Sequence, residues 1–344
     1  MAASLRISVL DQSPVSEGAT GPDALRNTLD LARLVDRLGY ARYWVAEHHG
    51  TPMLACAAPE VLIGPMAAAT QRIRVGSGGV MLPHYSPLKV AEVFSILSAL
   101  YPGRIDLGLG RAPGTDHTTA FALQRDRRQP APDDFPSQLA ELLAYFENTL
   151  PANHPFARLA ALPGRPHVPE VWLLGSSHQS ALWAGDSNLP YCFADFINPE
   201  GENIAAVYRE RAQSPRMMVA AWAICAETDE EAQRVASSAR MTRALMNQGK
   251  LIQVPPIDRA LEFLAHNGRD ADSVARPRRA IIGSPQTVRR GIEEVARLYQ
   301  AEEVMIVTIT YDHQDRRRSY ELIAEEFELT NSVAHPAAAT GSTK

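Results

Sequence analysis

Cysteine, long apolar runs and blocks of basic residues are all scarce in this sequence of 344 residues. Its three cysteines, Cys56, Cys192 and Cys225, lie far apart in apolar runs. This favours reduced core residues over a disulfide framework or a metal cluster, and it indicates a reducing compartment. No run approaches the roughly 20 apolar residues that a bilayer span needs, and the N-terminus does not resemble a signal peptide. These absences predict a cytoplasmic protein with no membrane partner.

The chain also lacks the charge and the glycine motif that two classes of nucleotide ligand require. A formal net charge of -5 and a pI near 6.1 offer no basic face to a phosphodiester backbone, so we expect no nucleic acid partner. No expected strand is followed by a Gly-x-Gly-x-x-Gly fingerprint. The nearest approach, Gly108-Leu109-Gly110, runs into Pro113, which does not suit the opening turn of that motif's helix.

What the sequence does have is a regular alternation of short apolar segments and longer amphipathic ones, which is typical of βα units around a parallel sheet. Eight strands in this order favour a closed (β/α)8 TIM barrel over an open doubly wound sheet. We expect one domain over residues 1–329 and a disordered tail at 330–344. The expected strands are 6–10, 43–46, 73–77, 105–109, 171–174, 191–194, 217–224 and 303–308, and the expected helices are 23–38, 59–69, 88–100, 136–146, 180–186, 202–213, 229–245, 285–300 and 315–327.

Two long stretches interrupt this alternation. Residues 112–134, rich in Arg, Asp and Pro, follow the fourth strand, and residues 249–278 lie between the seventh and the eighth. Both are longer than plain connectors, so we interpret them as insertions that act as lids or mobile excursions. The working residues of such a barrel follow the carboxyl ends of its strands, and candidate site residues are sought there.

The corner after the fifth strand has the chemistry of an anion site. Gly175, Ser176, Ser177 and Ser180 lie between a buried strand and a helix, so backbone N–H groups and hydroxyls collect at a helix N-terminus, which suits a phosphate. Arg111 ends the neighbouring fourth strand, and its guanidinium could clamp the same anion. A simple serine N-cap, which any helix can carry, is the alternative.

The second and third strands run into two further motifs. Glu47-His48-His49 could be a metal site, an acid–base group or a hydrogen-bonded structural corner. Adjacent histidines on a strand end point to opposite sides, which disfavours a metal site. A histidine at the rim is suited to moving protons, and a carboxylate beside it can accept hydrogen bonds from a heterocycle. Ser77-Gly78-Gly79 either lets the backbone approach a flat molecule or forms a plain turn.

Taken together, these rims resemble the bacterial luciferase-like family of flavin-dependent monooxygenases, over nearly the whole chain from Leu5 to about Glu326. The likeness is carried by residues 43–49 (YWVAEHH), 75–83 (VGSGGVMLP) and 103–111 (GRIDLGLGR). It implies reduced FMN (FMNH2) as the cofactor, with F420 as the less favoured cofactor, and no metal.

The resemblance also implies a role for the motif residues. Glu47 would lie beside the flavin ring, and His48 matches the family's catalytic histidine. The peptide between Gly78 and Gly79 falls where the family has a non-proline cis bond, and Gly110 stands where luciferase has a cysteine. The expected catalytic residues are His48 and Glu47, and the expected cofactor contacts are Glu47, Ser77, Gly78, Gly79, Gly110, Gly175 and the phosphate-binding Arg111, Ser176, Ser177 and Ser180.

On this resemblance we expect a monooxygenase that uses O2 and FMNH2 on a small organic substrate of unknown identity. A separate NAD(P)H-dependent flavin reductase would supply the reduced FMN. The richness of the sequence in Ala, Arg and Pro indicates a GC-rich genome, and in such genomes enzymes of this kind often tailor polyketides and other secondary metabolites. Related proteins pair through the helices that follow the early strands, so the apolar helix 59–69 predicts a homodimer.

Three alternatives keep parts of this interpretation. An F420-dependent oxidoreductase would use the same fold for hydride transfer without oxygen. A non-catalytic flavin-binding protein would bind FMN without turnover. A phosphosugar lyase or isomerase barrel would bind small phosphates without flavin, but the strand ends lack the lysine that Schiff-base chemistry needs.

Overall fold

The computed structural model describes residues 5–111, 115–124, 127–129, 133–159, 162–273 and 280–329. The expected tail at 330–344 lies outside these residues. The strands are β1 (Arg6–Asp11), β2 (Arg42–Val45), β3 (Arg74–Met81), β4 (Ile105–Gly110), β5 (Glu170–Gly175), β6 (Tyr191–Ala194), β7 (Met217–Cys225), β8 (Ala280–Gly283) and β9 (Glu303–Val307). The helices are α1 (Gly21–Leu38), α2 (Pro59–Ala69), α3 (Pro87–Leu100), α4 (His117–Leu123), α5 (Phe135–Glu147), α6 (His178–Asp186), α7 (Glu202–Arg211), α8 (Asp229–Asn247), α9 (Ile257–Ser273), α10 (Pro285–Tyr299) and α11 (His313–Glu326), with short 3-10 turns at Leu82–His84 and Ala157–Leu159.

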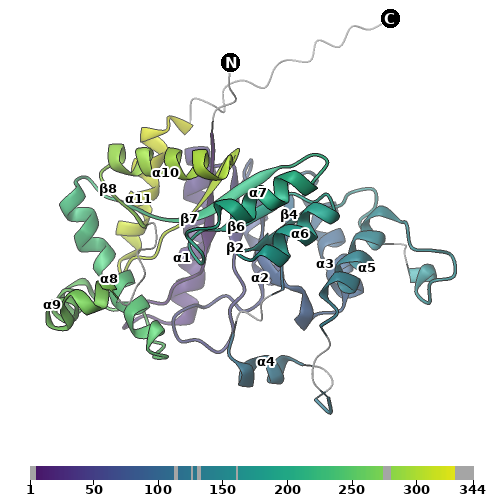
Figure 1. The fold of residues 1–344 in the computed structure, drawn as a ribbon, viewed down its shortest axis with the longest axis horizontal. Helices are drawn as coiled ribbons and strands as arrows, with labels where there is room; N and C mark the ends of the chain where they lie inside the picture. The colour runs from purple at the N-terminus through teal and green to yellow at the C-terminus, as the bar shows by residue number, and fades with distance from the viewer. Residues whose placement is uncertain are drawn as a thin grey trace, which may run out of the picture.

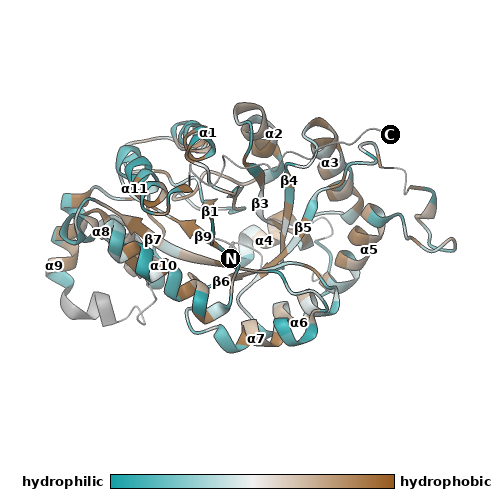
Figure 2. Cartoon of the chain, turned by 90° about the horizontal axis from the view of Figure 1, so that it is seen from above, coloured by the Kyte–Doolittle hydropathy of each residue, from teal (hydrophilic) through white to brown (hydrophobic). Residues whose placement is uncertain are grey.

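The described strands form a closed barrel with helices around its outer side (Figures 1 and 2). The ring runs from β1 through β2, β3, β4, β5, β6, β7 and β9 back to β1, and every neighbouring pair is parallel. The prediction of a (β/α)8 barrel is therefore confirmed.

The structure has one strand and two helices that the sequence pattern does not predict. β8 pairs with the second half of β7, at Trp222–Cys225, and stands outside the eight-stranded ring. Its apolar run of four residues is too short to be distinguished from part of a helix by periodicity. α4 follows β4, and α9 follows α8 in the connection that leads from β7 to β8, so both insertions contain helical structure within their described parts. Their action as lids stays a prediction.

Helix α1 shows how local sequence sets the ends of an element. The hydroxyl of Thr20 accepts from the N–H of Asp23, and the Asp23 carboxylate accepts from the N–H of Thr20, so two donors of the first turn are satisfied. The helix ends at Gly39, whose φ of 89° lies in the left-handed region that glycine adopts without steric cost.

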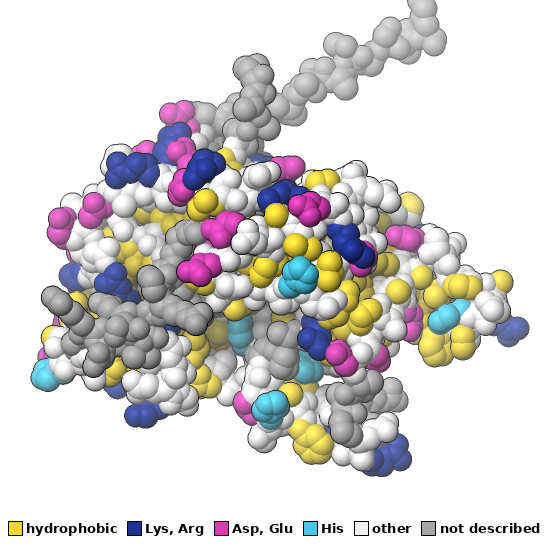
Figure 3. Space-filling model, viewed as in Figure 1, with side chains coloured by type: hydrophobic (Ala, Val, Ile, Leu, Met, Phe, Trp, Pro, Cys, Tyr) yellow, Lys and Arg dark blue, Asp and Glu magenta, His cyan; other side chains and the backbone are white. Residues whose placement is uncertain are grey.

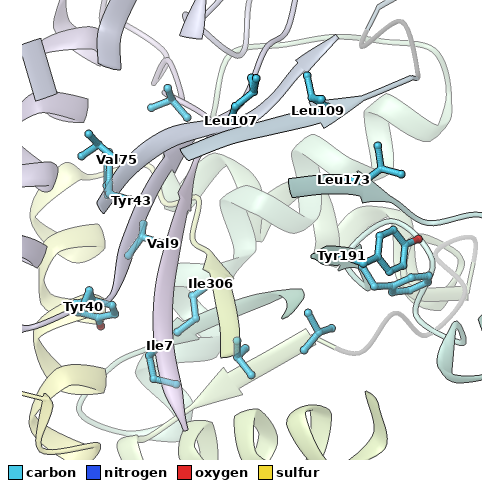
Figure 4. Close-up of a cluster of buried hydrophobic side chains, with 14 of the residues drawn as sticks. Ile7, Val9, Tyr40, Tyr43, Val75, Leu107, Leu109, Leu173, Tyr191 and Ile306 are labelled. Carbon is cyan, nitrogen blue, oxygen red and sulfur yellow. The ribbon is translucent and has the colours of Figure 1, made fainter. Parts of the chain in front are cut away.

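Two apolar layers hold the barrel together. The outer layer lies between strands and helices and includes Val9, Val75 and Leu107, which Figure 4 shows as sticks. The inner layer fills the barrel around Trp44 and Trp172, whose rings meet edge to face with centroids 5.7 Å apart. Because side chains fill the interior, a ligand must bind at one end of the barrel.

A buried charge cluster closes the amino-terminal end of the barrel. Nη1 of Arg42 lies 2.7 Å from Oδ2 of Asp106 and 2.7 Å from Oε2 of Glu170, and its Nε lies 3.1 Å from Oε1 of Glu303. The Arg42 side chain is only 4% exposed, and its Cζ lies 4.8 Å from the centroid of the Trp172 ring. Each of these residues begins or nearly begins its strand, so this end is structural and the carboxyl end remains for ligands.

The outer surface is mixed in charge and also exposes apolar side chains, for example on α2 and α3. On the face that Figure 3 draws, basic and acidic side chains are interspersed. Helix α2 buries Ile63 and Met66 but leaves Val61 65% exposed, and α3 leaves Leu100 65% exposed. None of the described helices combines the length and the apolar composition needed to cross a membrane.

Candidate functional site

A cavity of about 430 Å³ lies at the carboxyl ends of the strands. Its mostly apolar wall is formed by segments after β1, β2, β6 and β9, by β7 and by one side of α8. The start of α4 borders it as well: the Thr115 hydroxyl donates to the carbonyl oxygen of His49 at 2.9 Å, and α4 lies across this end of the barrel in Figure 1. This size and composition are typical of a small-molecule site.

His48 lies on the wall of the cavity, directly after β2. Its backbone N–H donates to the carbonyl oxygen of Cys56 at 2.9 Å, which fixes the chain at this point. Its Nδ1 atom is buried and has no hydrogen-bond partner among the described residues. Burial, together with the neighbouring His49, lowers the pKa of His48 from 6.5 to about 4. The ring is therefore neutral near pH 7, with one ring nitrogen buried and unpaired.

We expect the His48 ring to stay neutral at pH 6. Because its pKa is about 4 in the folded chain but ordinary in the unfolded chain, the unfolded state takes up the proton first, and stability falls as pH drops from about 6.5 toward 4. NMR titration of histidine-labelled protein should show no His48 transition near pH 6.5, and H48Q should lose less stability between pH 7 and pH 5 than the wild type. A His48 signal that titrates near 6.5 would contradict this account.

Glu47 is a buried hydrogen-bonded corner in this structure. Its Oε1 lies 2.8 Å from Nε2 of His49, and its Oε2 accepts from the backbone N–H of Met81 at 2.9 Å. The carboxylate thus ties the segment after β2 to the end of β3. A carboxylate oxygen can accept more than one hydrogen bond, so the expected contact between Glu47 and a cofactor stays a prediction. Within the described residues, no group of three His, Cys, Asp or Glu is arranged to hold a metal ion.

The paired glycines pack tightly against the barrel interior. The peptide between Gly78 and Gly79 is cis, as the resemblance implies. A Cβ on Gly78 would lie 2.5 Å from Cδ1 of Leu10, and one on Gly79 would lie 2.7 Å from the carbonyl oxygen of Gly108. The Ser77 hydroxyl donates to that same carbonyl at 2.9 Å. Gly79 is therefore required by the close packing of β3 on β4, and Gly78 by the contact of β3 with Leu10 and Trp44 in the barrel interior.

Arg111 lies against the helix whose start is the predicted anion site. Its Cζ is 5.6 Å from the centroid of the Trp183 ring on α6, and its Nη2 is 2.9 Å from each carboxylate oxygen of Asp133. The Arg111 and Asp133 side chains are 50% and 72% exposed. Exposed ion pairs contribute about 0–1 kcal/mol, so a bound phosphate can take the place of Asp133.

The serines at the start of α6 differ in their surroundings. The buried Ser180 hydroxyl donates to the carbonyl oxygen of Ser177 at 2.7 Å and lies 2.8 Å from the Tyr191 hydroxyl. Ser180 thus shapes the corner, and its contact with a phosphate stays a prediction. Ser176 is half-buried. Ser177 is exposed and is the N-cap of α6, because its hydroxyl accepts from the N–H of Ser180 at 3.2 Å. The N–H groups between them in the chain, of His178 and Gln179, have no acceptor within the helix. Gly175 is required because a Cβ there would lie 2.3 Å from the Ser180 oxygen.

The corner and the cavity are joined by the segment after β6. Phe196 and Ile197 line the cavity, and Asn198, the next residue, donates through Nδ2 to the carbonyl oxygen of Ser176 at 3.0 Å. One elongated molecule could therefore place an anionic end at α6 and a flat end at the cavity. The structure brings His48 and the corner to the same end of the barrel.

Gly110 lies at the end of β4, where a Cβ would meet the flexible end of the Met81 side chain.

Sequence reasoning missed Trp222 and Arg243, which both line the cavity. Trp222 lies inside the expected strand 217–224, whereas the predicted site residues follow strands. Its place on the same face of the strand as Met218 and Ala220, which fill the barrel interior, is the signal that points to it. Arg243 lies on α8, and no local signal separates it from Arg240 on the same helix. Its place in the cavity depends on how α8 packs.

Residues 5–302 match the family described as luciferase-like monooxygenase. A protein of that description from Escherichia coli (strain K12) is 38% identical to this chain over 92% of it and 96% of the relative. The N-acetyl-S-alkylcysteine monooxygenase of Bacillus subtilis (strain 168) is 35% identical, over 93% of this chain and 98% of the relative.

Solved structures show the same similarity. The crystal structure of apo-MsnO8 matches with a TM-score of 0.87 at 44% identity, covering 95% of this chain and 99% of the other. The oxygenating constituent of 3,6-diketocamphane monooxygenase of Pseudomonas putida, in complex with FMN, matches with a TM-score of 0.70 at 19% identity, covering 97% of this chain and all of the other, 100%. The second match concerns the fold alone.

Proposed function

The chain belongs to the luciferase-like monooxygenase family, and we propose that it oxidises a small organic substrate with O2 while holding a reduced FMN. The observation that supports this most directly is the arrangement at the carboxyl end of the barrel. His48, which is neutral and whose buried Nδ1 has no partner among the described residues, lies on the wall of an apolar cavity, and Asn198 connects that cavity to the corner at Ser176.

The chemistry of the described residues fits a flavin that carries a phosphate. Arg111, the hydroxyls of Ser176 and Ser177 and the first N–H groups of α6 form a donor set of the kind that binds phosphate. The cavity offers apolar surface to one edge of a flat ring and to a substrate beside it, and Nδ1 of His48 is a buried polar atom without a partner among the described residues. When bound, reduced flavin supplies the electrons that activate O2.

His48 would control a proton at Nδ1 in this reaction. Because burial lowers its pKa to about 4, the ring is ready to accept a proton at neutral pH and to return it. Glu47 and His49 would keep the backbone around His48 in place through their bonds to each other and to Met81. The apolar wall excludes water from the reacting atoms.

Two partners belong to the proposal. Reduced FMN would come from a separate NAD(P)H-dependent reductase, since the sequence has no dinucleotide fingerprint of its own. A second copy of the chain would cover the exposed Val61 of α2 and the exposed Ile96 and Leu100 of α3, because apolar side chains gathered on a helical surface favour association.

Anaerobic titration with reduced FMN tests the cofactor proposal. We expect R111M to weaken FMN binding by about tenfold to a hundredfold, the size of a lost charge-assisted contact, and to leave the binding of reduced riboflavin, which has no phosphate, unchanged. R211M, which breaks the exposed ion pair with Asp186 on the α6–α7 surface, is the matched control.

Three outcomes would change the proposal. Equal losses for FMN and riboflavin would separate Arg111 from the phosphate. Tighter binding of reduced F420 than of FMN would favour the deazaflavin alternative. Turnover is assayed by adding O2 and N-acetyl-S-benzylcysteine. This trial substrate is chosen because the Bacillus relative is named for its class. FMN binding with no oxygenated product from this or other organic acids would favour a non-catalytic flavin-binding protein.

A further inference from the structure

The cavity contains a cation whose charge no described residue balances. Arg243 of α8 lines the cavity and is half-buried, and its guanidinium makes no ion pair or hydrogen bond within the part of the chain that the structure describes. The other arginines of α8 differ: Arg234 pairs with Glu231 at 2.8 Å, and Arg240 bonds to Gln233. Arg243 is thus set apart from its neighbours by facing the cavity.

The carboxylate that lines the same cavity is engaged elsewhere. Asp116 caps α4: its Oδ1 accepts from the N–H groups of Thr118 and Thr119 at 2.8 Å and 3.0 Å, and its Oδ2 accepts from the Thr119 hydroxyl at 2.7 Å. These bonds lower the pKa of Asp116 and hold its negative charge at the start of α4. No ion pair joins Asp116 to Arg243 among the described residues, so the guanidinium of Arg243 keeps its donors for a ligand.

The rest of the wall defines what kind of ligand would fit. Leu54, Phe196 and Ile309 supply apolar surface, and Trp222 adds a ring whose buried Nε1 has no partner among the described residues. A half-buried guanidinium without a partner is costly, and the planar fork of arginine matches a carboxylate. The wall thus combines one fixed cation with a large apolar area.

We propose that the substrate is an organic acid with an apolar body, and that Arg243 binds its carboxylate inside the cavity. This rests on the proposed function and names its substrate class. With the carboxylate at Arg243, the apolar body of the acid would lie against the apolar wall to which Leu54, Trp222 and Ile309 contribute. The phosphate of the proposed flavin would bind elsewhere, at Arg111 and the start of α6, so the two anions would not compete.

Calorimetric titration with 4-phenylbutanoate and its neutral amide, 4-phenylbutanamide, tests this assignment. We expect the wild type to bind the acid about tenfold or more tightly than the amide, as a charge-assisted contact requires. R243M should bind both probes with the affinity of the wild type for the amide, which also shows that the cavity is intact. R243K should keep part of the preference because it keeps the charge.

The control is R240M, three residues earlier on α8, which should keep the full preference for the acid. Reduced FMN is titrated in parallel, and R243M should bind it like the wild type. The assignment is overturned if the wild type does not distinguish acid from amide, if neither probe binds, or if R243M keeps the preference or loses FMN affinity instead. Failure of the wild type to bind FMN while the acid preference persists would reject the proposed function and leave the acid site standing.

Discussion

Replacing His48 with alanine is expected to lower turnover of the trial substrate by about a hundredfold or more, the usual contribution of a positioned proton-transfer group, with little change in the affinity for reduced FMN. The side chain has no bond at Nδ1 within the described protein, and the contact with Cys56 is made by the backbone. Alanine therefore removes the free nitrogen without removing a bond that holds the fold. Product formed per bound flavin and the Kd for reduced FMN are the measurements.

Two further variants separate proton transfer from packing. H48Q fills much of the same space but cannot exchange a proton, so it should be nearly as slow as H48A. H167A replaces an exposed histidine near the start of β5, at the opposite end of the barrel, and should retain full turnover. If H48Q restored turnover, His48 would act by filling space or by hydrogen bonding; if H48A were as active as the wild type, another group would control the proton.

The sequence predicts the fold well because the barrel is built from local patterns. Each ring strand is an apolar run bounded by turn residues, and seven of the nine observed strands overlap expected ones within two residues at each end, while β3 runs on from 77 to Met81. That extension includes Gly78 and Gly79, and a pair of glycines is also typical of a turn. The short β8 is stabilised by its pairing with β7. The sequence of its own four residues does not predict this contact.

The site is predicted only where its residues follow strands. His48 and the corner at Ser176 obey that rule, and the structure places both at the carboxyl end of the barrel. The direction of the Ser180 hydroxyl depends on Tyr191 of the next strand, and the place of Arg243 depends on the packing of a whole helix. Such contacts join residues distant in sequence, so a single sequence carries no direct signal of them.

Removing the charge at the closed end of the barrel, by R42M, is expected to lower the free energy of unfolding by about 3–5 kcal/mol at pH 7, as breaking a buried ion pair does. Burial would raise the pKa of Glu170, but Arg42 and Arg216 bring it down to about 2. Without Arg42, Asp106 and Glu303, which are both almost fully buried, lose a shared counter-charge. Urea unfolding of wild type and variant measures the difference.

The pH dependence distinguishes lost charge from lost packing. Carboxylates with a lowered pKa stabilise the fold above their ordinary pKa and lose this effect as pH falls toward the folded value. The difference between wild type and R42M should therefore shrink below about pH 4.5, as Glu170 becomes protonated; a constant difference would assign the effect to packing of Arg42 on Trp172. R297M, which breaks an exposed pair with Glu294, should lower the free energy of unfolding by about 0.5 kcal/mol or less.

Because the charge cluster lies at the amino-terminal end of the barrel, the fraction of R42M that remains folded should bind reduced FMN normally. This result would show that one end of the barrel serves stability and the other serves chemistry.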